Sequence, residues 1–114
     1  AAARGLADLI GLQGATVTVA HDGQQALQRL DAEAFDVMLS DIGLPDMDGY
    51  ALARQVRARA GGERIALVAL SGFARADDVH KASKAGFDAH LGKPVSLEML
   101  WKAVQDALQR RREG

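Results

Sequence analysis

Short runs of apolar residues alternate along this chain with longer segments whose apolar residues recur at helical spacing. The short runs are typical of strands, and the longer segments are typical of amphipathic helices. Alternating strands and helices favour a parallel sheet, because each crossover connection returns the chain to the same end of the sheet. The pattern therefore predicts an α/β fold with a doubly wound parallel sheet.

Composition and capping residues place the expected elements. The predicted strands cover residues 15–20, 35–40, 65–70 and 88–92, and two of the predicted helices cover residues 1–13 and 75–85. Three further helices are expected to begin at the capping residues Asp22, Asp48 and Ser96. The inner faces expected for the last two of these helices consist of Leu52, Val56 and Ala60, and of Leu97, Leu100, Trp101, Val104 and Leu108. The 75–85 helix has only Val79 as a large apolar residue, so light packing is expected there.

Length and composition exclude several kinds of site and binding partner. The chain has 114 residues, enough for one domain over residues 1–114. It has no cysteine, which excludes disulfides, thiolate metal sites and cysteine nucleophiles. A net charge of −1 gives no electrostatic reason to expect nucleic acid, and the run Arg110–Arg112 is interpreted as a solvated helix end. No apolar run is long enough for a membrane span, so a cytoplasmic location is the default expectation.

Three polar residues stand where predicted strands end, namely Asp41, Ser71 and Lys93. Each of them alone is ordinary, since Asp and Ser are common in turns and lysine is common on surfaces. The carboxyl ends of parallel strands meet at one edge of the sheet, however, so a carboxylate, a hydroxyl and an ammonium should come together. These groups suit phosphoryl transfer, in which a carboxylate attacks phosphorus and a cation neutralises the transferred oxygens.

The segments DIGLPDMDG, ALSG and LGKP, in this order and spacing, resemble the receiver (CheY-like) domains of response regulators and hybrid sensor kinases. The resemblance implies a flavodoxin-like (βα)5 sheet with strand order 2-1-3-4-5. It also implies roles for individual residues. Asp41 would be the phosphoacceptor, Ser71 and Lys93 would bind the phosphoryl oxygens, Gly72 would leave room beside them, and Lys93–Pro94 would be a cis peptide.

Two departures from the family pattern affect these expectations. The family's first strand, with an acidic pair that holds Mg²⁺, has no counterpart before Ala1, so the domain is interpreted as N-terminally incomplete. Asp41 and the backbone carbonyl of Gly43 would then hold Mg²⁺ mostly with water. Because the missing strand is central in the family order, two unpaired half-sheets are expected, unless a second copy supplies a strand.

The second departure is His90, which stands where the family often has Tyr or Phe at a switch position. A histidine there is interpreted either as a pH-sensitive switch or as a residue that fills a half-buried place. His21 and His80 lack metal-ligand spacing and are expected on the surface.

The function implied by the resemblance is that Asp41 accepts a phosphoryl group from a histidine kinase or phosphotransfer domain, with Mg²⁺ as cofactor. The domain is not expected to be an enzyme beyond assisting its own phosphorylation and dephosphorylation, and its parent chain could be a hybrid histidine kinase. Neither nucleic acid nor a membrane is expected as a partner, and homodimerisation is left open. The alternative is a pseudo-receiver that only binds proteins. An aspartyl phosphatase is disfavoured because Gly43 replaces its second aspartate, and a flavodoxin-like cofactor site lacks a glycine-rich loop.

Overall fold

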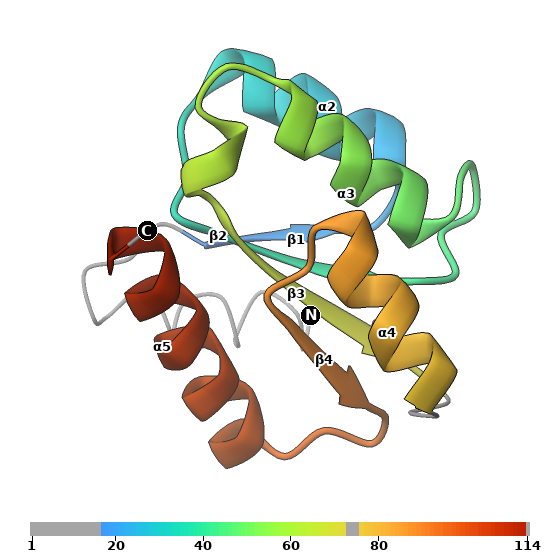
Figure 1. The fold of residues 1–114 in the computed structure, drawn as a ribbon. Coiled ribbons are helices and arrows are strands. Elements are labelled where there is room, and N and C mark those ends of the chain that lie inside the picture. The colour runs from blue at the N-terminus through green and yellow to red at the C-terminus, as the bar shows by residue number, and fades with distance from the viewer. Residues whose placement is uncertain (1–16, 73–75, 114) are drawn as a thin grey trace.

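The computed structural model describes residues 17–72 and 76–113. Strands and helices alternate within these ranges, as predicted (Figure 1). The predicted helix over residues 1–13 lies outside the described residues. The elements are β1 (Val17–Ala20), α2 (Gly23–Ala32), β2 (Val37–Asp41), α3 (Gly49–Ala58), the 3-10 helix η1 (Gly62–Arg64), β3 (Ala66–Ser71), α4 (Ala76–Ala85), β4 (Ala89–Gly92) and α5 (Leu97–Glu113).

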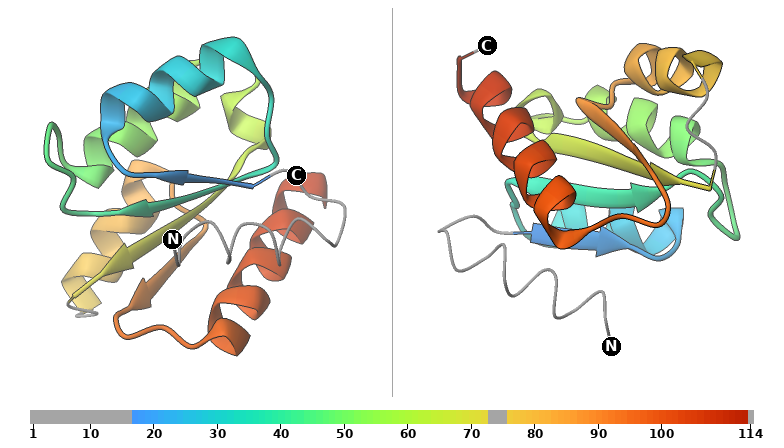
Figure 2. Two further views of the ribbon diagram at one scale, coloured as in Figure 1. Left: turned by 180° about the vertical axis from the view of Figure 1, so that it is seen from behind. Right: turned by 90° about the horizontal axis from the view of Figure 1, so that it is seen from below.

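The four described strands form one parallel sheet in the order β1-β2-β3-β4. Helices α2, α3 and α4 cover one face of the sheet, and α5 covers the other (Figures 1 and 2). Successive strand residues point to opposite faces, so they separate into two apolar clusters. Met38, Leu67 and Ala69 pack under α2, α3 and α4, whereas the intervening residues of β2 and β3 pack under α5. The predicted doubly wound parallel α/β fold is confirmed.

The expectation of two unpaired half-sheets is wrong. Strand β1 pairs directly with β2, and the ladder runs from Val17 opposite Val37 to Ala20 opposite Ser40. The physical reason is that backbone N–H and C=O groups inside a protein need partners, and this pairing supplies them. The sheet is therefore continuous from β1 to β4.

The predicted caps are present at all three helices. The Asp22 carboxylate accepts a hydrogen bond from the Gln25 N–H at 2.7 Å, and Asp48 accepts one from Ala51 at the same distance. The Ser96 hydroxyl accepts from the Met99 N–H at 3.1 Å. These caps fix where α2, α3 and α5 begin relative to the sheet.

The predicted helix faces need two corrections. Ala60 lies beyond the end of α3 and is exposed. Leu97 is 47% exposed because it stands in the first turn of α5, and the buried residues of that helix begin one turn later at Leu100. The light packing expected for α4 is confirmed, because Val79 is 45% exposed and the buried residues of this helix are Ala82 and Ala85. No helix in the described ranges combines the length and apolar character needed to cross a bilayer.

Candidate functional site

The three polar residues predicted at strand ends do meet at one edge of the sheet. Asp41 is the last residue of β2, Ser71 is the last residue of β3, and Lys93 directly follows β4. The parallel register places Asp41 opposite Leu70, and Ser71 opposite Gly92. A cleft of about 330 Å³ opens at this edge. Its lining consists of Asp41, Ile42, Gly43, Tyr50, Leu70, Ser71, Gly72, Asp78 and Lys93.

Lys93 and Asp41 face each other across this cleft as an ion pair between Nζ and Oδ1. The Oδ1 atom itself is buried, and it makes no aligned hydrogen bond within the described residues, so the contact is one of charge. The Lys93 and Asp41 side chains are 49% and 43% exposed, and a pair this exposed adds little to stability. The ion pair therefore contributes little to the stability of the fold.

Ser71 is held by two contacts from β4 and the turn after it. Its Oγ lies 3.0 Å from Nε2 of His90, and its backbone oxygen accepts a hydrogen bond from the Lys93 N–H at 2.7 Å. Nδ1 of His90 is buried and has no hydrogen-bond partner among the described residues. Ser71 is thus joined to Lys93 through the backbone and to His90 through its side chain.

The loop after Asp41 is folded tightly against the strand ends. The Gly49 N–H donates to the Ile42 oxygen at 2.6 Å, and the Ile42 N–H donates to the Leu70 oxygen at 3.0 Å. A Cβ on Gly49 would lie 2.6 Å from the Asp41 oxygen, so only glycine permits this approach. The loop consequently holds Asp41 in place from its carboxyl side.

Asp46 anchors the outer part of the same loop, a role that the sequence analysis missed. Its carboxylate accepts hydrogen bonds from the N–H groups of Gly23 and Gln24 at 2.8 and 2.9 Å, at the start of α2. These bonds, the one from Gly23 first, lower the pKa of Asp46 below its ordinary value of 3.8. No local pattern reveals this contact, because the partners are more than twenty residues apart in the chain.

Tyr50 and Asp78 also line the cleft, and the sequence analysis did not single them out. Burial raises the pKa of the Tyr50 hydroxyl, and the carboxylates of Asp78 and Asp48 raise it further. A negative side chain on α4 therefore stands at the cleft that also holds Lys93.

The chain matches the family described as response regulator receiver domain over residues 1–105. The chain belongs to this family. Among its relatives, an uncharacterised protein of Leptolyngbya boryana is 39% identical over 93 residues, which are 82% of this chain and 71% of that protein. The sensor histidine kinase RcsC of Salmonella typhimurium is 37% identical over 95 residues, which are 83% of this chain and 10% of the kinase. This receiver domain thus spans about a tenth of the length of such kinases.

Solved receiver structures resemble it over most of its length. A chemotaxis response regulator of Vibrio cholerae has a TM-score of 0.77 at 28% identity and covers 92% of this chain and 88% of its own. The receiver domain of a sensor histidine kinase of Pseudomonas aeruginosa has a TM-score of 0.75 at 28% identity and covers 95% of this chain and 89% of its own. That structure has a magnesium ion coordinated in its active-site cleft.

The remaining predicted positions of the receiver domain can now be located. The Lys93–Pro94 peptide bond is cis, as the resemblance implied. Gly43 and Gly72 line the cleft, and a Cβ on either would meet no atom of the described residues within 4 Å. His90 lies on β4 and faces Ser71, whereas His21 and His80 are exposed.

The fit of Mg²⁺ to this cleft rests on Asp41 and Gly43. No cluster of three or more His, Cys, Asp or Glu side chains suited to a metal occurs in residues 17–72 and 76–113. The cleft does offer the Asp41 carboxylate, one oxygen of which pairs with Lys93, and it is lined by Gly43, whose backbone carries a carbonyl. Mg²⁺ keeps several waters in most proteins and often takes one or two carboxylates, so these groups fit a water-rich site.

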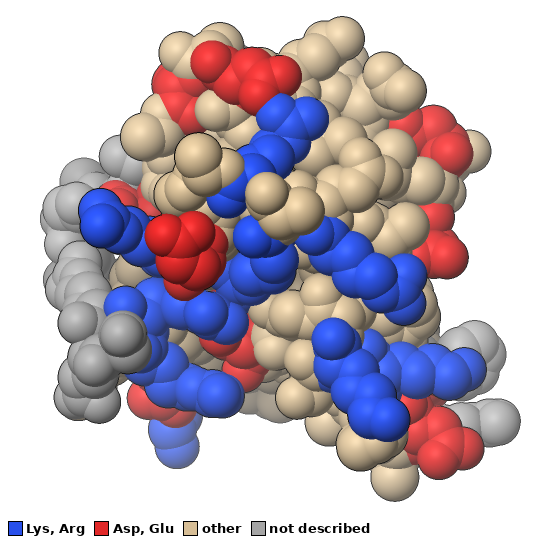
Figure 3. All heavy atoms as spheres, turned by 45° about the horizontal axis from the view of Figure 1, so that its top comes forward, with Lys and Arg blue, Asp and Glu red and all other residues tan. Residues whose placement is uncertain are grey.

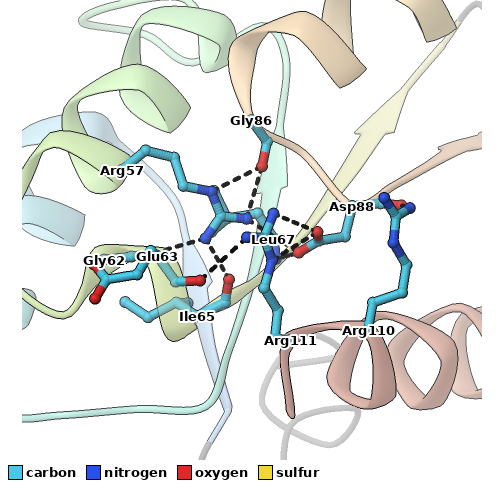
Figure 4. Close-up of polar contacts among 9 residues, drawn as sticks. All are labelled: Arg57, Gly62, Glu63, Ile65, Leu67, Gly86, Asp88, Arg110 and Arg111. Carbon is cyan, nitrogen blue, oxygen red and sulfur yellow. Dashed lines mark hydrogen bonds and ion pairs between the residues drawn. The ribbon is translucent and has the colours of Figure 1, made fainter. Parts of the chain in front are cut away.

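A second polar cluster lies at the amino ends of β3 and β4 (Figure 4). The Asp88 side chain is 1% exposed and forms ion pairs with Arg57 of α3 at 3.0 Å and with Arg111 of α5 at 2.6 Å. It also accepts a hydrogen bond from the Leu67 N–H at 2.9 Å. Arg57 donates further to three backbone oxygens, those of Gly62, Ile65 and Gly86. The Asp88 cluster (Arg57, Asp88 and Arg111) therefore joins α3, β3, β4 and α5.

The interpretation of Arg110–Arg112 as a solvated helix end is wrong for Arg111. Its side chain is only 26% exposed, because the guanidinium reaches the Asp88 carboxylate and the Glu63 backbone oxygen. Burial first, and then the nearby charge of Arg111, lower the pKa of the Arg57 guanidinium. Figure 3 shows lysine and arginine side chains gathered in a band across one face of the molecule.

Proposed function

We propose that this receiver domain accepts a phosphoryl group on Asp41. The observation that carries the proposal is the ion pair of Asp41 with Lys93 in a cleft that Ser71 also lines. A carboxylate that faces an ammonium and a hydroxyl is suited to attack phosphorus, because the cation and the donor can bind the oxygens that arrive with it.

The proposed donor is a phosphohistidine on a histidine kinase or phosphotransfer domain. A carboxylate oxygen of Asp41 attacks phosphorus, the P–N bond to the donor breaks, and an acyl phosphate forms while the electron pair stays on the histidine nitrogen. The Lys93 ammonium and the Ser71 hydroxyl then bind phosphoryl oxygens. Mg²⁺, held by Asp41 and the Gly43 carbonyl, would neutralise negative charge on the transferred group.

Phosphorylation adds a charge of about −2 at the cleft, beside α4. Helix α4 packs through Ala82 and Ala85, with Val79 exposed, so it is the proposed moving element. Amide hydrogen exchange should be faster in α4 than in α5, and equal protection of the two helices would contradict this assignment.

The similar sensor kinases suggest what kind of larger protein this domain belongs to. Sensor histidine kinases contain a similar segment, so a hybrid histidine kinase is the proposed parent protein, and the cytoplasm is the proposed location. The domain is proposed to signal through protein partners, without nucleic acid and without catalysing reactions on other substrates. A second copy of the chain is a candidate partner, which light scattering with and without phosphodonor would test.

The test is phosphorylation of the chain by acetyl phosphate with Mg²⁺, measured by intact mass. The natural chain should gain one phosphoryl group, Asp41→Asn should gain none, and the matched control Asp77→Asn, at an exposed position of α4, should behave like the natural chain. A gain that survives Asp41→Asn would refute the assignment of the acceptor.

The second candidate function is that of a pseudo-receiver, a protein-binding module that is not phosphorylated. The absence of a three-ligand acidic cluster in the described ranges favours it. Calorimetric titration with Mg²⁺ separates the candidates, because a phosphoacceptor should bind the ion and lose this binding in Asp41→Asn. Absence of both Mg²⁺ binding and phosphorylation would contradict the phosphoacceptor assignment and favour the pseudo-receiver.

A further inference from the structure

The loop that joins β2 to α3, residues 42–48, is closed like a hairpin. Gly43 and Asp48 form an antiparallel bridge near its two ends. A backbone hydrogen bond between the residues just outside this bridge closes the loop further. Residues 44–47 therefore form the tip of the loop, at a distance from the strand ends that the bridge holds together.

The tip of the loop is docked on the start of α2. Asp46 uses both carboxylate oxygens, since Oδ1 accepts from the Gly23 N–H at 2.8 Å and Oδ2 accepts from the Gln24 N–H at 2.9 Å. The first N–H groups of a helix have no acceptor within it and carry partial positive charge, so a carboxylate is stabilised there. Met47 lies directly against Gly23, because a Cβ on that glycine would overlap the Met47 side chain. Both polar and apolar contacts thus fix the tip.

Gly43 has few contacts of its own. It lines the cleft together with Asp41, it is exposed, and a Cβ placed on it would meet no atom of the described residues within 4 Å. Glycine also has the widest range of backbone conformations of any residue. The place of Gly43 at the cleft therefore depends on its bridge to Asp48 and on the tip that Asp46 ties down.

We infer that Asp46 is a positioning residue, which fixes the backbone of Gly43 at the cleft by tying the tip of the loop to α2. The inference rests on the proposed function and deepens it, because the Gly43 carbonyl is a proposed ligand of Mg²⁺. Without the tie, the loop would adopt the arrangement that binds the ion for only part of the time. The apparent dissociation constant then rises by the inverse of that fraction.

The first test examines the loop in the full chain without metal. Asp22 offers a matched control, because its carboxylate lies at the same helix start but bonds to Gln25 within that helix. Nitrogen-15 relaxation measures the order parameter of each backbone amide. This parameter should fall at Gly43 in Asp46→Ala and stay unchanged there in Asp22→Ala. An unchanged Gly43 in Asp46→Ala, or an equal fall in both variants, would overturn the inference.

The second test measures the dissociation constant of Mg²⁺ by calorimetric titration. Asp46→Ala should raise it about fivefold, as expected if the released loop keeps the binding arrangement about a fifth of the time. Asp46→Asn retains one acceptor oxygen and should raise it only about twofold. Asp22→Ala removes the same charge beside the same helix and should leave the constant unchanged. Thermal melts show whether each variant is folded at the temperature of the titration.

The outcomes separate this inference from the proposed function. If Asp22→Ala weakens Mg²⁺ binding as much as Asp46→Ala does, or if Asp46→Asn binds no more tightly than Asp46→Ala, the effect is one of charge and the inference is overturned. If Mg²⁺ binds equally to the natural chain and to Asp46→Ala, the inference fails and the proposed function stands. If the natural chain neither binds Mg²⁺ nor takes up phosphate, the proposed function fails. The order parameter of Gly43 then decides whether Asp46 fixes the loop.

Discussion

Replacing Asp88 with alanine should destabilise the domain more than any other single loss of an acidic side chain described above. The carboxylate is 1% exposed, and its removal leaves Arg57, Arg111 and the Leu67 N–H without their shared acceptor. Breaking a buried ion pair from one side costs about 3–5 kcal/mol. Arg57 keeps its three backbone acceptors and Arg111 is 26% exposed, so the lower end applies, about 3 kcal/mol.

Urea denaturation followed by circular dichroism measures this change directly. A loss of about 3 kcal/mol is a large part of the roughly 5–15 kcal/mol that stabilises a typical domain. The matched control is Asp106→Ala, the same change at an exposed position of α5, which should alter the free energy of unfolding by no more than about 0.5 kcal/mol. Equal losses in the two variants would show that the Asp88 cluster does not stabilise the fold.

Three further predictions concern the loop and the turns. The hydrogen bonds that lower the pKa of Asp46 stabilise the fold above the ordinary carboxyl pKa, and this stabilisation is lost as pH falls through the lowered pKa. In Asp46→Asn the free energy of unfolding should therefore fall less steeply below about pH 4, which acid titration of unfolding measures. Gly62→Ala should lower the free energy of unfolding in urea by at least about 2 kcal/mol, because the new Cβ would lie 1.8 Å from a backbone oxygen. Gly43→Ala should be tolerated, because its Cβ would meet no atom of the described residues within 4 Å. Asp48→Ala should lower the free energy of unfolding in urea by about 1 kcal/mol, because the cap of α3 is lost. Asp48→Asn should keep most of the stabilisation that the cap provides.

The meeting of Asp41, Ser71 and Lys93 could be predicted because it follows from topology. Once the strands are known to be parallel, their carboxyl ends share one edge, and residues at those ends become neighbours. The caps at Asp22 and Asp48 could be predicted for a similar reason, since the carboxylate and the N–H that it binds are three residues apart. Local spacing and strand order are both visible in a sequence.

The Asp88 cluster could not be predicted, because its members lie far apart in the chain. Arg57 and Arg111 are 31 and 23 residues from Asp88, and helical spacing does not show which arginine turns inward. The exposure of Leu97 is a similar case. Its spacing from Leu100 fits the inner stripe of α5, but periodicity does not show where a helix first contacts the sheet. Whether β1 pairs with β2 depends on which other strands could occupy the position beside β2 in the sheet. The composition of a single strand does not show this.

Strand β4 and its flanking residues make three unlike contacts within a few positions. Asp88 binds two arginines, His90 bonds to Ser71, and Lys93 pairs with Asp41. A slip of one residue would turn every side chain of the strand to the wrong face and break all three contacts together. Insertions and deletions in this stretch should therefore be purged in descendants of this protein, even where the overall fold would survive them. In β4 and its flanking residues, ligand binding can therefore evolve only through substitutions that keep the length of the strand.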